Sequence, residues 1–475
     1  MESFDEIYIL NLHGSAKKLE VAPDGSKDEN VFDIQQGVCI GLFVKHNRKS
    51  AQAKVYHGDL WGDRNAKNTF LLSNEINTSS WNLLAPSSPN YFFVPKDFSF
   101  EKEYKSYHSI RDIFTLGQNG LKTDRDDLFF DFQRDTLIER MKTFYSSAGK
   151  QRDFLEKYNV FDSSSFDIEA RRSSTRFNQQ FVKSCLYRPF DFRWLYYNPN
   201  LVSRPAFEVM QHINDKKNLA LICLRQSRRS EEGTFLVADR LINKDAVTIF
   251  DIATVFPLYL HNSDDAASQR ELSLGFSKSP ITNLKSAFVM DAARRLRVKF
   301  DLDNTKDRIA SFGPEDIFHY IYAIFYSPTY RERYAEFLKI DFPRVPLTRN
   351  LDLFRALVAK GADLVALHLM ESPALEKPIT TFVGRGDNGV ASGYPKYEKK
   401  TVWINAEQGF EGVPQNVYEF HIGGYQVCHK WLKDRRGRTL SAEDKTHYAK
   451  IVVALRETMR LMREIDEVIP GWPIE

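Results

Sequence analysis

Three short stretches near the start of the chain have the composition of β-strands, and they are too few to make a sheet with two buried faces. Residues 6–13 (EIYILNLH) are rich in β-branched and aromatic residues and are followed by Gly14. The apolar run 38–44 (VCIGLFV) is typical of a buried strand. Residues 53–57 follow a short basic turn, so we expect them to form a hairpin with 38–44. Residues 1–65 are therefore predicted to be the edge of a larger sheet.

Length and composition restrict the class of protein. The 475 residues predict two to four domains. With 66 Lys and Arg against 63 Asp and Glu, a DNA-binding surface would have to be a local patch. Four Cys without a C-x-x-C pair argue against a zinc ribbon or a disulfide framework. No apolar run reaches the roughly 18 residues of a membrane span, and the acidic start is unlike a signal peptide. We expect a cytoplasmic protein.

The remaining sequence predicts an α+β fold in three parts. Residues 186–260 contain candidate strands at 193–197, 219–224, 234–238 and 247–250, and a helix is predicted near 133–146. Pro314 has the position of a helix start, and Ser441 to Asp444 can form a capping box before a last helix with a continuous apolar stripe. We predict an incomplete sheet edge over 1–70, a mostly β core over 71–310, and a helical part over 311–475.

The motifs for methyl transfer to an amino group are missing from this sequence. That reaction needs a glycine-bearing loop for the methyl donor and a polar-Pro-Pro-aromatic segment that binds the amine. The nearest string is Asn198-Pro199-Asn200, which lacks the second proline and the aromatic residue. We therefore expect no catalytic residues in this chain and no methylation by the chain alone.

Nuclease and metal sites are not supported by the sequence either. Pro23-Asp24 is not followed by an Asp/Glu-x-Lys triplet. The acidic residues at 124, 126 and 127 are better explained as a solvated turn, or as a loop stabilised by its own Asp and Thr hydrogen bonds. The eleven His residues show no ligand spacing, so no metal is predicted.

Basic runs are the strongest positive signal for nucleic-acid binding. Arginine can make bidentate contacts with guanine and glutamine with adenine, while serine and lysine can bind phosphates. A solvated face is the default interpretation of any single run, and three runs in a nearly neutral chain favour DNA. Arg294 to Arg297 form one run. The predicted DNA-binding residues lie in the other two runs and in the segments between them: Arg225, Gln226, Ser227, Arg228, Arg229, Arg240, Lys244, Lys433, Arg435, Arg436 and Arg438.

The segment 187–197 (YRPFDFRWLYY) combines charged and aromatic residues but is predicted to be structural. Pro189 and the aromatic residues suit a turn that leads into a strand. Asp191 and Arg193 are expected to form an ion pair that stabilises this turn. A contact with substrate is the alternative.

Several stretches together resemble the C-terminal region of Type ISP restriction–modification enzymes. These enzymes join a nuclease, a helicase-like ATPase, an N6-adenine methyltransferase and a terminal target-recognition domain in one polypeptide. The matching stretches cover nearly the whole chain: 7–14, 28–45, 120–127, 187–197, 316–346 and 424–448.

The resemblance implies that residues 1–70 are the last strands of a methyltransferase domain and that the rest is the target-recognition domain, a mixed α/β domain with C-terminal helices. It implies that Phe32 stacks on an extruded target base; the alternative is a phenylalanine that fills the sheet edge. It further implies double-stranded DNA and an upstream catalytic portion or subunit as partners, and S-adenosylmethionine as a cofactor of the complete enzyme but not of this chain alone.

The expected function is therefore sequence-specific recognition of duplex DNA in phage defence, with an adenine placed for methylation by a catalytic part outside this chain. Two alternatives stay open. The chain could be a complete adenine-specific DNA methyltransferase or nuclease with unrecognised motifs, or a non-catalytic protein-interaction subunit.

Overall fold

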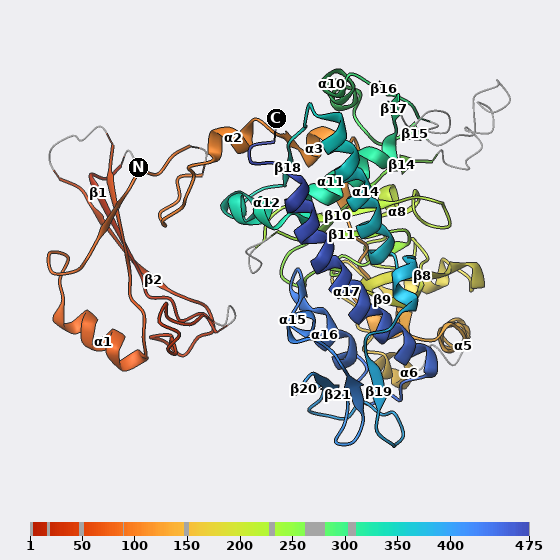
Figure 1. The fold of residues 1–475 in the computed structure, drawn as a ribbon. Coiled ribbons are helices and arrows are strands. Elements are labelled where there is room, and N and C mark those ends of the chain that lie inside the picture. Colours follow the sequence, from red (N-terminus) through yellow and green to blue (C-terminus); the bar gives the residue numbers. More distant parts are fainter. Residues whose placement is uncertain are drawn as a thin grey trace. The chain divides into compact units, whose positions relative to one another are not determined.

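The chain divides into two units, residues 1–99 and 100–475, in the computed structural model shown in Figure 1. The structure describes residues 3–16, 20–46, 52–88, 90–146, 152–227, 233–261, 281–302 and 310–474. The domain boundaries expected after residues 70 and 310 stay predictions.

The first unit is a four-stranded sheet with one helix. Its elements are β1 (Glu6–Asn11), β2 (Cys39–Val44), β3 (Lys54–Asp59), α1 (Arg64–Ser73) and β4 (Asn82–Leu84). The strand order is β2-β1-β3-β4; β1 is antiparallel to β2 and parallel to β3. The three predicted strands are confirmed, but the predicted hairpin between the second and third is wrong, because β1 lies between them.

The position of β1 follows from the burial of its side chains. Ile7 packs in a small core with Ala53 and Val55, against which Ile9 and Leu84 also lie. β2 is left as an edge strand, and it exposes apolar side chains on both faces: Leu42 opposite Tyr8 on one, and Phe43 opposite Ile7 on the other. An edge strand that is apolar on both faces has the composition of an internal strand.

The second unit contains two four-stranded sheets. The first has the order β11-β10-β13-β6 and the second the order β12-β8-β9-β7. Every residue of β10, β11 and β13 is buried, which explains their unbroken apolar sequences. The strands of the two sheets are β6 (Gln118–Asn119), β7 (Phe130–Asp131), β8 (Val182–Arg188), β9 (Asp191–Tyr196), β10 (Ala220–Leu224), β11 (Phe235–Ala238), β12 (Leu241–Ile242) and β13 (Ala253–Pro257).

Three of the four strands predicted in this region are present, as β9, β10 and β11. The fourth prediction, a strand over 247–250, is wrong: these residues belong to a loop that precedes β13. The apolar residues of the loop were mistaken for a buried strand, although Ile249 and Phe250 are exposed. Of the two expectations for the acidic residues at 124–127, hydrogen bonding to a neighbouring Thr is confirmed: the Thr123 hydroxyl donates to Asp126, the first residue of the short helix α4 (Asp126–Phe129).

Three helices form the core of the C-terminal part: α11 (Pro314–Tyr326), α14 (Leu351–His368) and α17 (Ala442–Val468) (Figure 1). Pro314 is the first residue of α11, and Ser441 and Asp444 form the predicted capping box of α17. Gly361 of α14 lies so close to α11 that an added Cβ would be 1.9 Å from the carbonyl oxygen of His319. This glycine allows the two helix backbones to approach each other.

A buried polar network joins the same three helices. His368 of α14 lies 2.5 Å from the Tyr322 hydroxyl of α11 and 2.9 Å from the Thr458 hydroxyl of α17. Because Thr458 donates its own proton to the Ala454 carbonyl, it accepts from Nε2 of His368, and Nδ1 accepts from Tyr322. The neutral imidazole satisfies every partner, and burial lowers the pKa of His368 to about 3.

Short elements connect these parts. The helices are α2 (Glu101–Lys105), α3 (Ile110–Ile113), α4 (Asp126–Phe129), α5 (Arg134–Tyr145), α6 (Arg152–Lys157), α7 (Ile168–Ser173), η2 (Gln179–Phe181), α8 (Phe207–Met210), α10 (Ser286–Leu296), α12 (Pro328–Arg333), α13 (Ala335–Leu338), η3 (Pro373–Glu376), α15 (Gln415–Tyr418) and α16 (Val427–Lys433). The helix predicted near 133–146 is confirmed as α5. A further sheet, β19-β22-β21-β20, consists of Thr381–Val383, Gly409–Glu411, Thr401–Trp403 and Lys396–Glu398. The two-stranded sheets pair β14 (Tyr259–Leu260) with β15 (Ile281–Thr282), β16 (Lys299–Phe300) with β17 (Ser311–Phe312), β18 (Arg344–Val345) with β5 (His108–Ser109), and β23 (His421–Ile422) with β24 (Tyr425–Gln426).

None of the helices in the described ranges is long and apolar enough to cross a membrane.

Candidate nucleic-acid interface

The first basic run begins where β10 ends, at one edge of the β11-β10-β13-β6 sheet. Leu224 pairs with Ala253, so Arg225 lies beside the loop that leads into β13. The Arg225 side chain is 67% exposed, with its Nε 3.6 Å from Asp341. Gln226 is exposed and donates to the Ile340 carbonyl at 3.2 Å. Both side chains therefore have surface available for a ligand.

The other residues of this run differ in their accessibility. Ser227 is buried. Arg228 and Arg229 lie outside the described residues. The loop beside Arg225 exposes Ile249 and Ile252, so apolar and basic groups meet at this edge of the sheet.

Arg240 and Lys244 occupy different surroundings. Arg240 forms an ion pair with Asp239 at 2.7 Å, donates to the Ser184 hydroxyl at 3.3 Å, and covers the ring of Phe192. It therefore packs on the β8–β9 sheet. Lys244 forms an ion pair with Asp245 at 2.5 Å, and its carbonyl accepts from the backbone of Ala253, at the edge that carries Arg225. The structure thus brings Lys244, but not Arg240, to the edge of the first run.

The second basic run forms the turn between α16 and α17. Lys433, Arg436 and Arg438 are exposed there, whereas the Arg435 side chain is only 6% exposed. Gly437 allows the tight turn with φ +75°, and its amide donates to the Val390 carbonyl at 2.8 Å. We call residues 433–438 the basic turn.

Arg435 anchors the basic turn to β9. Its Nη2 donates to the buried carboxylate of Asp191 at 2.9 Å, and its Nη1 donates to the Trp431 carbonyl at 3.0 Å. Arg193 donates to the other oxygen of Asp191 at 2.7 and 3.0 Å, so the predicted Asp191–Arg193 pair is confirmed. Burial alone would raise the pKa of Asp191, but attraction to the two guanidinium groups outweighs it and lowers that pKa below its usual value.

The guanidinium groups of this cluster also stack on aromatic rings. Arg193, Arg435 and Arg438 lie 4.3, 4.7 and 4.3 Å from the ring centre of Phe132. Arg435 also lies 3.3 Å from the ring centre of Trp431. Cation–π contacts of this kind favour Arg over Lys. Arg438 is exposed beside a rigid base, which is a suitable geometry for binding an anion.

The third run, on α10, is engaged within the unit. Arg294 and Arg295 both form ion pairs with Asp291, and Arg295 also donates to the Leu347 carbonyl at 3.3 Å. Arg297 is the C-cap of the helix, with φ +58°. These contacts support a structural role.

Phe32 projects from the first unit, where its side chain is 60% exposed. It does not fill the sheet edge. Its backbone amide donates to the Asn30 side chain at 2.9 Å, so the exposed ring is attached to a fixed backbone. Nearby, Lys67 and Asp28 form a fully buried ion pair at 2.6 Å.

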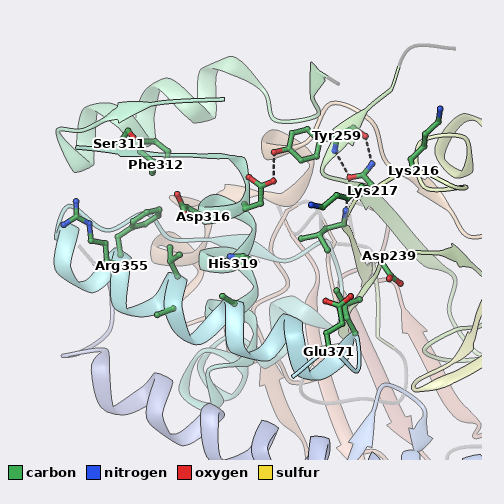
Figure 2. Close-up of a pocket in the computed structure, with 18 of the residues that line it drawn as sticks. Lys216, Lys217, Asp239, Tyr259, Ser311, Phe312, Asp316, His319, Arg355 and Glu371 are labelled. Carbon is green, nitrogen blue, oxygen red and sulfur yellow. Dashed lines mark hydrogen bonds between the residues drawn. The ribbon is translucent and has the colours of Figure 1, made fainter. Parts of the chain in front are cut away.

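Figure 2 shows a separate pocket of about 1280 Å³ in the second unit. It lies at the start of β10, at the end of that strand opposite to Arg225. Tyr259 donates to Glu315 at 2.6 Å on its wall. Its charged lining residues are of both signs: Lys216, Lys217, Arg355, Asp239, Glu315, Asp316 and Glu371. This mixture does not favour a polyanion.

Sequence reasoning missed two features of these sites. It did not identify the buried Asp28–Lys67 pair, and it treated Arg435 like its exposed neighbours. Exposed and buried positions in a turn do not alternate with a regular period, so the sequence alone could not show that Arg435 is buried. Within the ranges that the structure describes, no group of three or more His, Cys, Asp and Glu residues could hold a metal ion.

Comparison with known proteins places the chain in a family. The model of the Type ISP C-terminal specificity domain matches residues 112–464. A search of curated proteins gave no significant match.

Three solved structures share the fold. They are a nuclease-deletion mutant of the Type ISP restriction–modification enzyme LlaGI in complex with a DNA substrate mimic (20% identity, TM-score 0.71, 99% of this chain and 44% of that chain), the DrdV–DNA complex (19%, 0.71, 97% and 48%) and the ATP-dependent Type ISP enzyme LlaBIII bound to DNA (18%, 0.72, 100% and 31%). The chain therefore spans less than half the length of these proteins. Because the family model covers more than half of the chain, the expected resemblance is confirmed, and the chain belongs to the Type ISP C-terminal specificity domain family.

Proposed function

We propose that the chain is a sequence-specific duplex DNA recognition module of a Type ISP-like restriction–modification enzyme, and that it positions an adenine for N6 methylation by a catalytic part outside this chain. The match of the family model to residues 112–464 carries this proposal. The three similar structures support it, since each contains DNA or a DNA mimic.

The accessible basic residues have distinct parts in this proposal. Arg225 and Gln226 read base edges, because arginine and glutamine match the donor and acceptor patterns of guanine and adenine in the major groove. Lys433, Arg436 and Arg438 bind phosphates and fix the register, together with Lys244 and Arg240. Arg435 holds the basic turn in place through Asp191. Arg228 and Arg229 extend the first run, and Phe32 stacks on the extruded adenine.

S-adenosylmethionine, which the family implies for the complete enzyme, supplies the methyl group when it is bound. The segment that follows β1 does not fit it: an added Cβ at Gly14 would be 2.4 Å from Cα of Asn30, so the Asn30 backbone fills the space beside this glycine. We propose that the chain alone binds no methyl donor, which isothermal titration with S-adenosylmethionine would test; micromolar binding would favour a complete methyltransferase.

The main test is selection of DNA by the full chain. A pool of duplexes with a randomised core is bound, recovered and sequenced, and the affinity of the enriched duplex is measured at several salt concentrations. We expect one short asymmetric sequence and a linear fall of log K with log salt concentration, because phosphate binding releases counterions. Failure to enrich any sequence, together with affinity that does not depend on salt, would favour a protein-interaction subunit.

A further inference from the structure

The loop that carries Phe32 is exposed at its tip and fixed along its backbone. Residues 30–36, here called the Phe32 loop, present Phe32 and Ile34 to the surface. The Asn30 side chain closes the loop: its Nδ2 donates to the Gln36 carbonyl at 2.5 Å and to the Gly14 carbonyl at 3.2 Å. Its Oδ1 accepts from the Phe32 amide at 2.9 Å. One buried side chain therefore ties both ends of the loop to the segment that follows β1.

Helix α1 contacts the same loop through Arg64. Arg64 is the first residue of α1, and its guanidinium donates to the Asn30 carbonyl at 3.0 Å and to the Phe32 carbonyl at 3.2 Å. It also forms an ion pair with Asp33 at 2.8 Å. The planar guanidinium can bind these three acceptors at once because its donors point in fixed directions.

A buried ion pair lies at the base of the loop. Lys67 is one turn after Arg64, and its ammonium group binds Asp28 at 2.6 Å and the carbonyls of Leu12 and Glu29 at 2.8 and 2.7 Å. Asp28 in turn accepts from the Gly14 and Gly62 amides at 2.6 and 2.9 Å. All three protons of the ammonium group have acceptors, so burial of this pair leaves no unsatisfied charge.

We propose that Arg64 and Asn30 are positioning residues for base stacking: they preform the Phe32 loop so that the ring meets an extruded base without a further ordering step. This inference rests on the proposed function, because it assigns to Phe32 an adenine as its ligand. A loop that is already ordered loses little conformational entropy on binding, so it binds the base more tightly than a loop that must first become ordered. Arg64 acts through the loop and need not touch DNA.

The test uses the full chain, a fully paired duplex of the enriched sequence, and a set of duplexes of the same sequence in each of which one adenine lies opposite an abasic site. An unpaired adenine needs less energy to leave the helix, so a stacking site favours it. The measured quantity is the ratio of the affinity for each abasic duplex to the affinity for the paired duplex, and the largest ratio is taken as the preference. We expect Phe32→Ala to abolish the preference, and Arg64→Ala and Asn30→Ala each to reduce it by about tenfold. Lys54→Ala, which removes an exposed cation from β3, is the matched control and should leave it unchanged.

Two further measurements separate positioning from contact. Amide hydrogen exchange at residues 30–36 should accelerate in Arg64→Ala but not in Phe32→Ala. The salt dependence of DNA affinity should not change in Arg64→Ala. A decrease of about 0.9 in the salt slope would identify Arg64 as a phosphate contact and overturn the inference.

The outcomes distinguish this inference from the proposed function. If the wild type prefers no abasic duplex, or if Phe32→Ala keeps the preference, base stacking by Phe32 is refuted and the positioning role falls with it. If Phe32→Ala loses the preference while Arg64→Ala and Asn30→Ala keep it, the positioning role is overturned and base stacking stands.

Discussion

The basic turn allows a quantitative test of how the chain would bind DNA. The triple substitution Lys433→Ala, Arg436→Ala and Arg438→Ala removes three exposed cations. Each phosphate contact contributes about 0.9 to the slope of log K against log salt concentration. If all three bind phosphates, the slope should become shallower by about 2.7. Because Arg438 also stacks on Phe132 and Arg436 donates to the Tyr394 carbonyl, the free energy of unfolding should fall by about 0.5–1 kcal/mol at each of these two sites. At Lys433 it should change by less than about 0.5 kcal/mol.

Arg435→Lys is the matched variant, since it keeps the charge of the turn and changes only its anchor. The guanidinium of Arg435 donates to Asp191 and to the Trp431 carbonyl and stacks on Phe132 at the same time. A lysine ammonium group is compact and not planar, so it could not make all three contacts at once. We expect the free energy of unfolding to fall by about 1–3 kcal/mol while the salt slope stays the same. Urea denaturation measures the first quantity, and fluorescence anisotropy of the enriched duplex at several salt concentrations measures the second.

Two results would refute this reasoning. An unchanged slope in the triple variant would show that the turn does not bind phosphates. A slope that becomes shallower by about 0.9 in Arg435→Lys, without loss of stability, would show that Arg435 faces DNA rather than Asp191.

Three predictions concern the fold itself. The folded pKa of His368 is about 3, below its unfolded value, so its contribution to stability is complete well above pH 6.5 and is lost as pH falls. In urea titrations, wild type should therefore lose about 2 kcal/mol more than His368→Gln between pH 8 and 5. Gly361→Ala should destabilise the second unit by about 3 kcal/mol or more in thermal unfolding, since its Cβ would be 1.9 Å from the His319 carbonyl oxygen. Gly471→Ala is the control and should be nearly neutral, because an added Cβ there has no atom within 4 Å. Ser441→Ala should cost about 1 kcal/mol through loss of the α17 cap, measured by urea denaturation; no change would mean that the capping box contributes nothing.

The elements with local causes were predictable from the sequence. β10 and β11 are apolar because both faces are buried, and α17 begins at its capping box because that motif satisfies its first amides. The hairpin of 38–44 with 53–57 was predicted wrongly. Ile7 of β1 packs in one core with Ala53 and Val55, so β1 lies beside β3 and separates it from β2. This packing between distant segments cannot be read from the sequence. Apolar composition alone cannot separate a buried strand from an exposed apolar loop, which is why 247–250 was misassigned.

The candidate site was predictable only in part, for the same physical reason. Asp191 and Arg193 are two residues apart on one strand, so their ion pair could be expected from the sequence. Arg435 lies 244 residues further along the chain and donates to the other oxygen of the same Asp191 carboxylate, and only the fold brings it there. The number of basic residues in a run is therefore larger than the number of phosphates that the run can bind, because some of the basic side chains form ion pairs with buried acids. The number of phosphates that the basic turn can bind is set by its three exposed cations and not by the four that the sequence contains, and the salt slope measures this difference directly.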